Sequence, residues 1–87
     1  MADYKIRIKQ SAKKELFKLP KKELKKITDK IISLSVNPRQ KGVEKLSGDD
    51  KYRIRQGNYR IIYLIQDEQL IIIIIKIGHR KDIYRKR

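Results

Sequence analysis

Three arginines in the second half of the chain have a spacing that gathers positive charge. Arg53 and Arg55 alternate with apolar residues, so in a strand their side chains lie on the same face. Arg60 follows a Gly57-Asn58 turn and comes within cross-strand reach of that pair. Three guanidinium groups this close repel one another unless they are solvated or face an anion. The spacing therefore predicts an anion-binding sheet face, with a plain solvated basic face as the alternative.

A second group of candidate residues follows the longest apolar run. His79 is the only histidine of the chain, and histidine is the residue type whose ordinary pKa best suits general acid–base catalysis near neutral pH. Arg80 comes next, and Tyr84 could stack on a base, donate a proton or anchor the tail of the chain. A surface histidine and a packing tyrosine are the alternatives.

The residues needed for several other chemistries are missing. The chain has no cysteine and one histidine, and its carboxylates are not clustered, so we expect no metal centre. It has no glycine-rich phosphate loop, and we expect no cofactor. The remaining residues suit metal-independent RNA cleavage, because the ribose 2′-OH is itself the nucleophile. The protein then has to hold the RNA, move two protons and stabilise a phosphorane with cations. Arginine suits the last task but cannot act as a base.

The composition indicates the same class of partner. The 87 residues include 24 Lys and Arg against 10 Asp and Glu, a formal net charge of +14, which favours partners rich in phosphate or carboxylate. Residues 1–48 hold 12 Lys and 2 Arg, whereas residues 49–87 hold 4 Lys and 6 Arg. Lysine suits a solvated helix surface and arginine suits bidentate phosphate contact. We therefore expect the site in the second half.

The length allows one small domain, residues 1–87. The longest apolar run, Leu70 to Ile75, is far shorter than the ~20 residues of a membrane span. No signal-peptide pattern is visible at the start. We expect a cytoplasmic protein with no membrane partner.

The first half of the chain has the pattern of a strand followed by two helices. Residues 4–9 alternate as a half-buried strand does. Ser11 is the expected N-cap of a short helix, and Pro20 suits the first turn of a second helix that ends at Asn37-Pro38. The apolar stripe of the second helix consists of Leu24, Ile27, Ile31 and Leu34. We expect the two helices to form a hairpin.

The second half has the pattern of three strands joined by short turns. Residues 52–55 and 59–65 flank the turn at 56–58, and Asp67-Glu68 leads into an aliphatic run at 70–77. We expect this last run to be a central strand covered on both faces. The order β-α-α-β-β-β predicts an α+β fold, in which an antiparallel sheet carries the N-terminal helical hairpin on one face.

Four segments together resemble the RelE/ParE toxin superfamily of type II toxin–antitoxin systems. The resemblance covers essentially the whole chain and implies the RelE-like microbial RNase fold. The segments are Lys45-Leu46-Ser47-Gly48, Tyr52-Arg53-Ile54-Arg55, Gly57-Asn58-Tyr59-Arg60-Ile61-Ile62-Tyr63 and Ile77-Gly78-His79-Arg80-Lys81-Asp82-Ile83-Tyr84.

The RelE branch implies a ribosome-dependent endoribonuclease that cleaves mRNA in the A site of the small subunit and so inhibits translation. The motifs that match place the catalytic cations of this branch on Arg53, Arg55, Arg60 and Arg80, and its C-terminal tyrosine on Tyr84. Some RelE toxins have a lysine base at the alternating pair, where this chain has two arginines, and their tyrosine lies farther from the preceding arginine. His79 is therefore our candidate proton acceptor. The expected RNA-binding residues are Lys45, Lys51, Lys81 and Arg85.

Two other functions stay open at this point. The ParE branch has the same fold and inhibits DNA gyrase by binding, without cleaving nucleic acid. A non-catalytic basic binding module is the third hypothesis. For a toxin of either branch, the resemblance implies a cognate antitoxin as protein partner, and for the RelE branch also the ribosome and mRNA. Contact with DNA is expected only indirectly, through the antitoxin complex.

Overall fold

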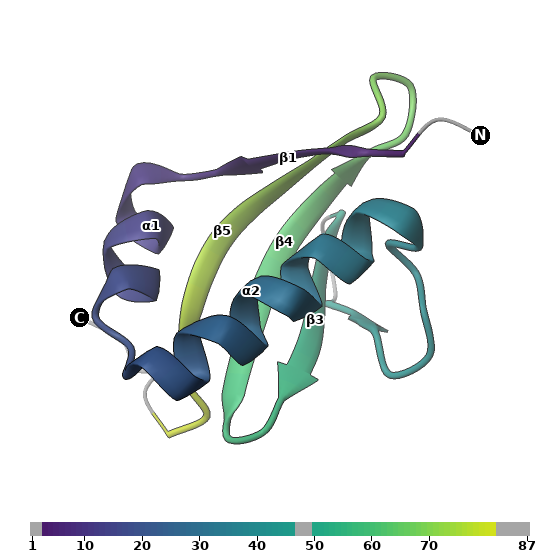
Figure 1. Cartoon of the computed structure of the whole chain (residues 1–87). Coiled ribbons are helices and arrows are strands. Elements are labelled where there is room, and N and C mark those ends of the chain that lie inside the picture. The colour runs from purple at the N-terminus through teal and green to yellow at the C-terminus, as the bar shows by residue number, and fades with distance from the viewer. Residues whose placement is uncertain (1–2, 47–49, 82–87) are drawn as a thin grey trace.

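The computed structural model of the chain describes residues 3–46 and 50–81. A five-stranded sheet carries two helices on one face (Figure 1). The elements in chain order are β1 (Lys5–Ile8), α1 (Gln10–Phe17), α2 (Lys21–Val36), β2 (Glu44–Lys45), β3 (Lys51–Gln56), β4 (Tyr59–Gln66) and β5 (Ile71–His79). This arrangement confirms the α+β prediction and the helical hairpin next to the N-terminus.

The sheet is mixed, which corrects the prediction of an antiparallel one. Its strand order is β1-β5-β4-β3-β2, and β1 pairs with β5 in parallel, with Lys5 opposite Ile71 and Ile8 opposite Ile74. The other neighbours are antiparallel, as their short turns require. The helical hairpin is long enough to carry the chain across the sheet from β1 to β2, so the direction of β1 is not fixed by a turn. The two-residue strand β2 is also absent from the predicted order.

The hydrophobic core lies between the helices and one face of the sheet. α1 lies over β5, and α2 crosses the sheet in front of β4 and β3 (Figure 1). The apolar stripe of α2 is confirmed, because Ile27, Ile31 and Leu34 are buried. Each fully buried isoleucine or leucine contributes roughly 1.5–3 kcal/mol. Ser11 is not a cap, because α1 begins at Gln10 and its N-cap residue, Lys9, makes no capping side-chain bond.

The β3–β4 turn is tight and depends on glycine. Gly57 has φ +61, a value that side chains with a Cβ rarely adopt. Glycine with positive φ at the first position of a two-residue turn is typical of a type II′ hairpin. This turn fixes the register of β3 against β4.

The face of the sheet opposite the helices is only partly covered by the described residues. Ile71, Ile73 and Ile75 of β5 are half-buried, so the prediction that this strand is covered on both faces is wrong. The register also shifts: Ile62 pairs with Lys76 but Tyr63 pairs with Ile74, which makes Ile75 the extra residue of a β-bulge. We refer to this side of the sheet as the open face.

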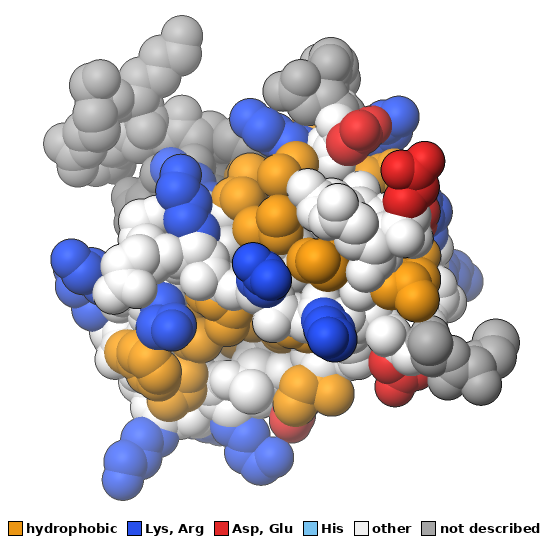
Figure 2. Space-filling model, turned by 90° about the horizontal axis from the view of Figure 1, so that it is seen from above, with side chains coloured by type: hydrophobic (Ala, Val, Ile, Leu, Met, Phe, Trp, Pro, Cys, Tyr) orange, Lys and Arg blue, Asp and Glu red, His pale blue; other side chains and the backbone are white. Residues whose placement is uncertain are grey.

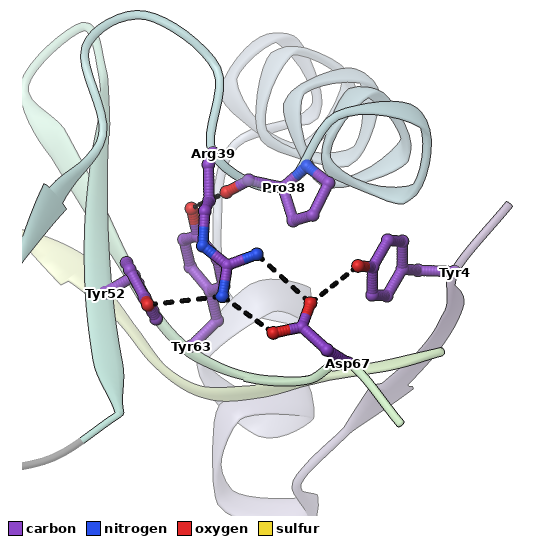
Figure 3. Close-up of polar contacts among 6 residues, drawn as sticks. All are labelled: Tyr4, Pro38, Arg39, Tyr52, Tyr63 and Asp67. Carbon is purple, nitrogen blue, oxygen red and sulfur yellow. Dashed lines mark hydrogen bonds and ion pairs between the residues drawn. The ribbon is translucent and has the colours of Figure 1, made fainter. Parts of the chain in front are cut away.

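A polar cluster joins the segment after α2 to the β4–β5 turn (Figure 3). Arg39 donates two hydrogen bonds to the Asp67 carboxylate, at 2.8 and 3.1 Å, and Tyr4 donates a third at 2.6 Å. These donors lower the pKa of Asp67 to about 2. The Arg39 guanidinium also lies 5.4 Å from the ring centroid of Tyr52. Beside them, the buried Tyr63 hydroxyl donates to the Pro38 carbonyl at 2.7 Å. The cluster holds the end of the sheet that lies away from the β3–β4 turn.

Candidate functional site

The register of β3 and β4 brings the three arginines to the open face. Arg55 lies directly opposite Arg60, and Arg53 lies opposite Ile62. Ile62 is 7% exposed but does not belong to the core cluster between helices and sheet. Side chains of directly paired residues project from the same face. Arg53, Arg55 and Arg60 therefore surround a small apolar surface on the side away from the helices.

An ion pair and a hydrogen bond restrain two of these arginines. Arg53 forms an ion pair with Glu44, the residue opposite it on β2, and its side chain is 23% exposed. Arg60 donates from Nη1 to the carbonyl oxygen of Tyr59 at 3.2 Å. Arg55 is exposed. Glu44 introduces a negative charge at the edge of the cluster that sequence analysis did not consider.

Lys76 is a site residue that sequence analysis missed. It lies opposite Ile62 on β5, so Arg53, Ile62 and Lys76 form one row across three strands of the open face. The row next to it consists of Arg55, Arg60 and Gly78. A single lysine inside an aliphatic strand was the available signal, because a strand buried on both faces excludes a charge.

His79 lies on the other side of the sheet from the arginines. It pairs with Tyr59, which packs against the core, and its ring meets the Tyr59 ring edge-on, with centroids 5.6 Å apart and an interplanar angle of 76°. Its Nδ1 accepts a hydrogen bond of 3.1 Å from the backbone N–H of Lys81. The neutral ring therefore carries its proton on Nε2. In this tautomer Nε2 is a donor, and the role of His79 as proton acceptor stays a prediction.

The remaining predicted residues occupy several places. The backbone N–H of Arg80 donates to the Asn58 carbonyl at 2.8 Å, which ties the end of β5 to the β3–β4 turn, and the Arg80 side chain is exposed. Lys51 lies on the open face, opposite Leu64, whereas Lys45 lies opposite Tyr52 and so projects toward the helix side. Lys81 is exposed after β5. Tyr84 and Arg85 lie outside the described residues.

On the side of the molecule that Figure 2 shows, Lys and Arg side chains are spread over the surface with hydrophobic side chains exposed between them, while Asp and Glu gather mostly on one side. Within residues 3–46 and 50–81, no group of three or more His, Asp or Glu could hold a metal ion. In the same part of the chain, no helix is both long and apolar enough to cross a membrane.

The fold and the open face define a class of protein: a small basic α+β domain with clustered arginines on its central strands. Comparisons with known proteins agree with this class. The model of the family described as the ParE toxin of the type II toxin–antitoxin system parDE matches residues 6–84. The chain belongs to the RelE/ParE toxin superfamily of type II toxin–antitoxin systems.

Individual relatives match over nearly their whole length. Toxin RelG of Mycobacterium tuberculosis is 33% identical over 95% of this chain and 98% of its own. In the crystal structure of the toxin–antitoxin complex RelBE2 from the same organism, one chain matches with a TM-score of 0.82 and 29% identity, covering 94% of this chain and 97% of that one. A chain of the archaeal RelE–RelB complex from Pyrococcus horikoshii matches with a TM-score of 0.81 and 32% identity, covering 92% of this chain and 98% of that one.

Proposed function

We propose that this toxin is a ribosome-dependent endoribonuclease that cleaves mRNA in the A site without a metal ion, and that a cognate antitoxin holds it inactive. The observation that carries the proposal is the direct pairing of Arg55 with Arg60 on a face that also holds Arg53 and Lys76. Like charges directly opposite one another destabilise a sheet. Their presence is explained if the face binds the phosphates of RNA.

The chemistry assigned to this face is attack of the ribose 2′-oxygen on the adjacent phosphate, which forms a 2′,3′-cyclic phosphate and breaks the P–O5′ bond, so that the 5′-oxygen leaves and takes up a proton. Arg55 and Arg60 stabilise the charge of the phosphorane, a contribution of roughly 10²–10³ in rate for each donor in comparable sites. Arg53 and Lys51 hold the flanking backbone. The proton of the 2′-OH needs an acceptor that arginine cannot supply. On the open face, Lys76 lies in the row beside Arg60 and is the proposed acceptor.

The residues at the end of β5 complete the proposed site. Arg80 and Lys81 follow the strand at its exposed end, where RNA approaches across the Gly57-Asn58 turn. Tyr84, by resemblance, stacks on a base or delivers a proton, and Arg85 binds the RNA backbone. His79 borders the site from the helix side, and Lys45 adds charge at the edge of the sheet.

Primer extension on an mRNA in a translating extract tests this proposal. The expected result is cuts within the codon in the A site. No cuts should appear without ribosomes. A chelator of divalent ions, added after the ribosomes have been fixed on the message, should not change the cuts. The matched control is Arg60→Ala, which should leave the mRNA intact. Intact mRNA with the wild-type protein would overturn the proposal.

A gyrase inhibitor is the second candidate, because the matching family model is that of ParE toxins. It predicts intact mRNA and loss of DNA supercoiling in a reaction with purified gyrase. A non-catalytic binding module predicts neither effect and normal growth of cells that overexpress the chain. The antitoxin part of the proposal is supported by the similar chains seen in toxin–antitoxin complexes. Co-purification with the product of a neighbouring reading frame tests it, and DNA binding should then depend on that partner.

A further inference from the structure

A helix side chain forms a hydrogen bond with the backbone of strand β5. Oε1 of Glu15 on α1 accepts the backbone N–H of Ile77 on β5 at 3.0 Å. Glu15 is half-buried between the helix and the sheet. The two residues are 62 positions apart in the sequence, so the bond is purely tertiary.

The N–H of Ile77 needs this acceptor because the neighbouring strand ends too early. β1 pairs with β5 only as far as Ile74, and the N–H of Lys9 donates to the Ile74 carbonyl as the last bond along that edge. Beyond this point no described strand continues on that side of β5. A buried backbone N–H without an acceptor is strongly disfavoured. Glu15 therefore takes the place of a missing strand.

The bond lies at the point where β5 could lose its register. Ile75 is the bulge residue, and the strand resumes its pairing with β4 at Lys76. A shift of one residue moves every side chain beyond it to the opposite face of the sheet. Such a shift would take Lys76 off the open face and put a side chain where Gly78 now lies opposite Arg60.

We propose that Glu15 is a positioning residue: its bond to Ile77 locks the register of β5 after the bulge and so keeps Lys76 and Gly78 beside the arginines. The effect on catalysis rests on the proposed nuclease function, whereas the effect on register does not. α1 stays docked without this bond, because Ala12 and Leu16 of the same helix are buried in the core.

Two variants of Glu15 separate the hydrogen bond from packing and charge. Glu15→Met keeps the length of the side chain but has no oxygen acceptor, and Glu15→Gln keeps the acceptor without the charge. Asp29→Ala is the matched control, since it removes an exposed helix carboxylate that forms an ion pair with Lys25 one helical turn away. Circular dichroism confirms that each variant is folded before it is tested.

The first measurement is amide hydrogen exchange at Ile77, followed by NMR. Protection should fall at least about tenfold in Glu15→Met, which corresponds to the loss of one hydrogen bond, and remain near the wild-type value in Glu15→Gln and Asp29→Ala. Unchanged protection in Glu15→Met would overturn the proposal. This measurement gives its answer even if the protein does not cleave RNA.

The second measurement is A-site cleavage at increasing ribosome concentration. In Glu15→Met, kcat should fall about tenfold or more while KM changes little, and Glu15→Gln should restore kcat. If Glu15→Met turns over at the wild-type rate although Ile77 has lost its protection, the positioning role is wrong. If wild type itself does not cleave, the proposed function fails, and the exchange result still decides whether Glu15 fixes the register.

Discussion

Arg55 and Arg60 lie directly opposite one another across β3 and β4, on the face of the sheet opposite α1 and α2. The Gly57-Asn58 turn fixes this pairing, because Gln56 and Tyr59 close the two-residue hairpin and leave no freedom in register. The side chains of two arginines therefore project from the same face of neighbouring strands. On the proposed function, this pair would lower the stability of the sheet and contribute to phosphate binding.

The first prediction concerns this pair. Arg55→Gln should raise the free energy of unfolding by about 0.2–1 kcal/mol, because it removes a like-charge cross-strand contact. It should also lower A-site cleavage at saturating ribosome. Arg60→Ala should lower the cleavage rate by roughly 10²–10³. The rate of Arg60→Lys should lie between those of wild type and Arg60→Ala, because lysine keeps the charge but lacks the planar guanidinium group. Urea unfolding and single-turnover cleavage check both effects. A variant at Arg55 that is less stable and fully active would contradict the prediction.

The second prediction concerns Lys76. Lys76→Arg keeps the positive charge but cannot release a proton near neutral pH, so RNA affinity should be retained while the cleavage rate falls roughly tenfold or more. Lys76→Met should lower both the RNA affinity and the cleavage rate. Filter binding to a single-stranded RNA and cleavage kinetics separate the two quantities. Equal rates for Lys76→Arg and wild type would show that Lys76 contributes only charge.

The third prediction concerns the ion pair at the edge of the open face. Glu44 neutralises part of the charge of Arg53, so Glu44→Gln should strengthen binding to single-stranded RNA by about two- to fivefold at low salt, the range expected for an exposed ion pair. The gain should disappear at high salt, where such charges are screened. Glu68→Gln, in the β4–β5 turn, is a control for the change in net charge alone. An equal gain in both variants would argue against a local effect.

The fourth prediction concerns acid stability. The pKa of Asp67 is lowered from 3.8 to about 2, first by its hydrogen bonds from Arg39 and then by the bond from Tyr4. The ionised carboxylate thus stabilises the folded state above pH 3.8, and this contribution is lost as the pH falls toward 2. Asp67→Asn should be less stable at neutral pH, with a flatter dependence of the unfolding free energy between these values. Urea titrations at several pH values check it, and a parallel decline in both proteins would contradict it.

The fifth prediction concerns the buried hydroxyl of Tyr63. Tyr63→Phe removes the donor to the Pro38 carbonyl, which should cost about 1–3 kcal/mol because a buried acceptor is left unpaired. Burial raises the pKa of Tyr63, so the wild-type protein should also lose stability as the pH rises above ~10, where the unfolded tyrosine ionises. The phenylalanine variant should lack this part of the alkaline loss. Thermal unfolding from neutral to alkaline pH measures both.

Local patterns predicted most of the elements of this fold. The alternation at Arg53 and Arg55, the Gly57-Asn58 turn and the apolar stripe of α2 each depend on residues close in sequence, and each has the predicted structure. The parallel pairing of β1 with β5 could not be predicted in this way, since no turn links the two strands. The two residues of β2 are too few to show alternation.

The parts of the site that sequence reasoning missed depend on long-range contacts. An unbroken aliphatic run gives no sign of which residue forms a bulge, so the register that puts Lys76 in the arginine row was not visible. The same shift and the contact with Tyr59 determine the side on which His79 lies. Glu44 reaches Arg53 through the unpredicted strand β2, and Glu15 reaches Ile77 from a different layer of the fold.

The pairing of β1 with β5 also sets when the toxin becomes complete during its own synthesis. β1 is made first and its partner last, so the nascent chain contains an unpaired N-terminal strand until β5 has left the ribosome. Contacts of such wide sequence separation form late. Arg53, Arg55 and Arg60 are already translated by then, but the strand with Lys76 and Gly78 is not yet beside them. On the proposed function, each molecule would be inactive until β5 has been translated and has paired with β4 and β1.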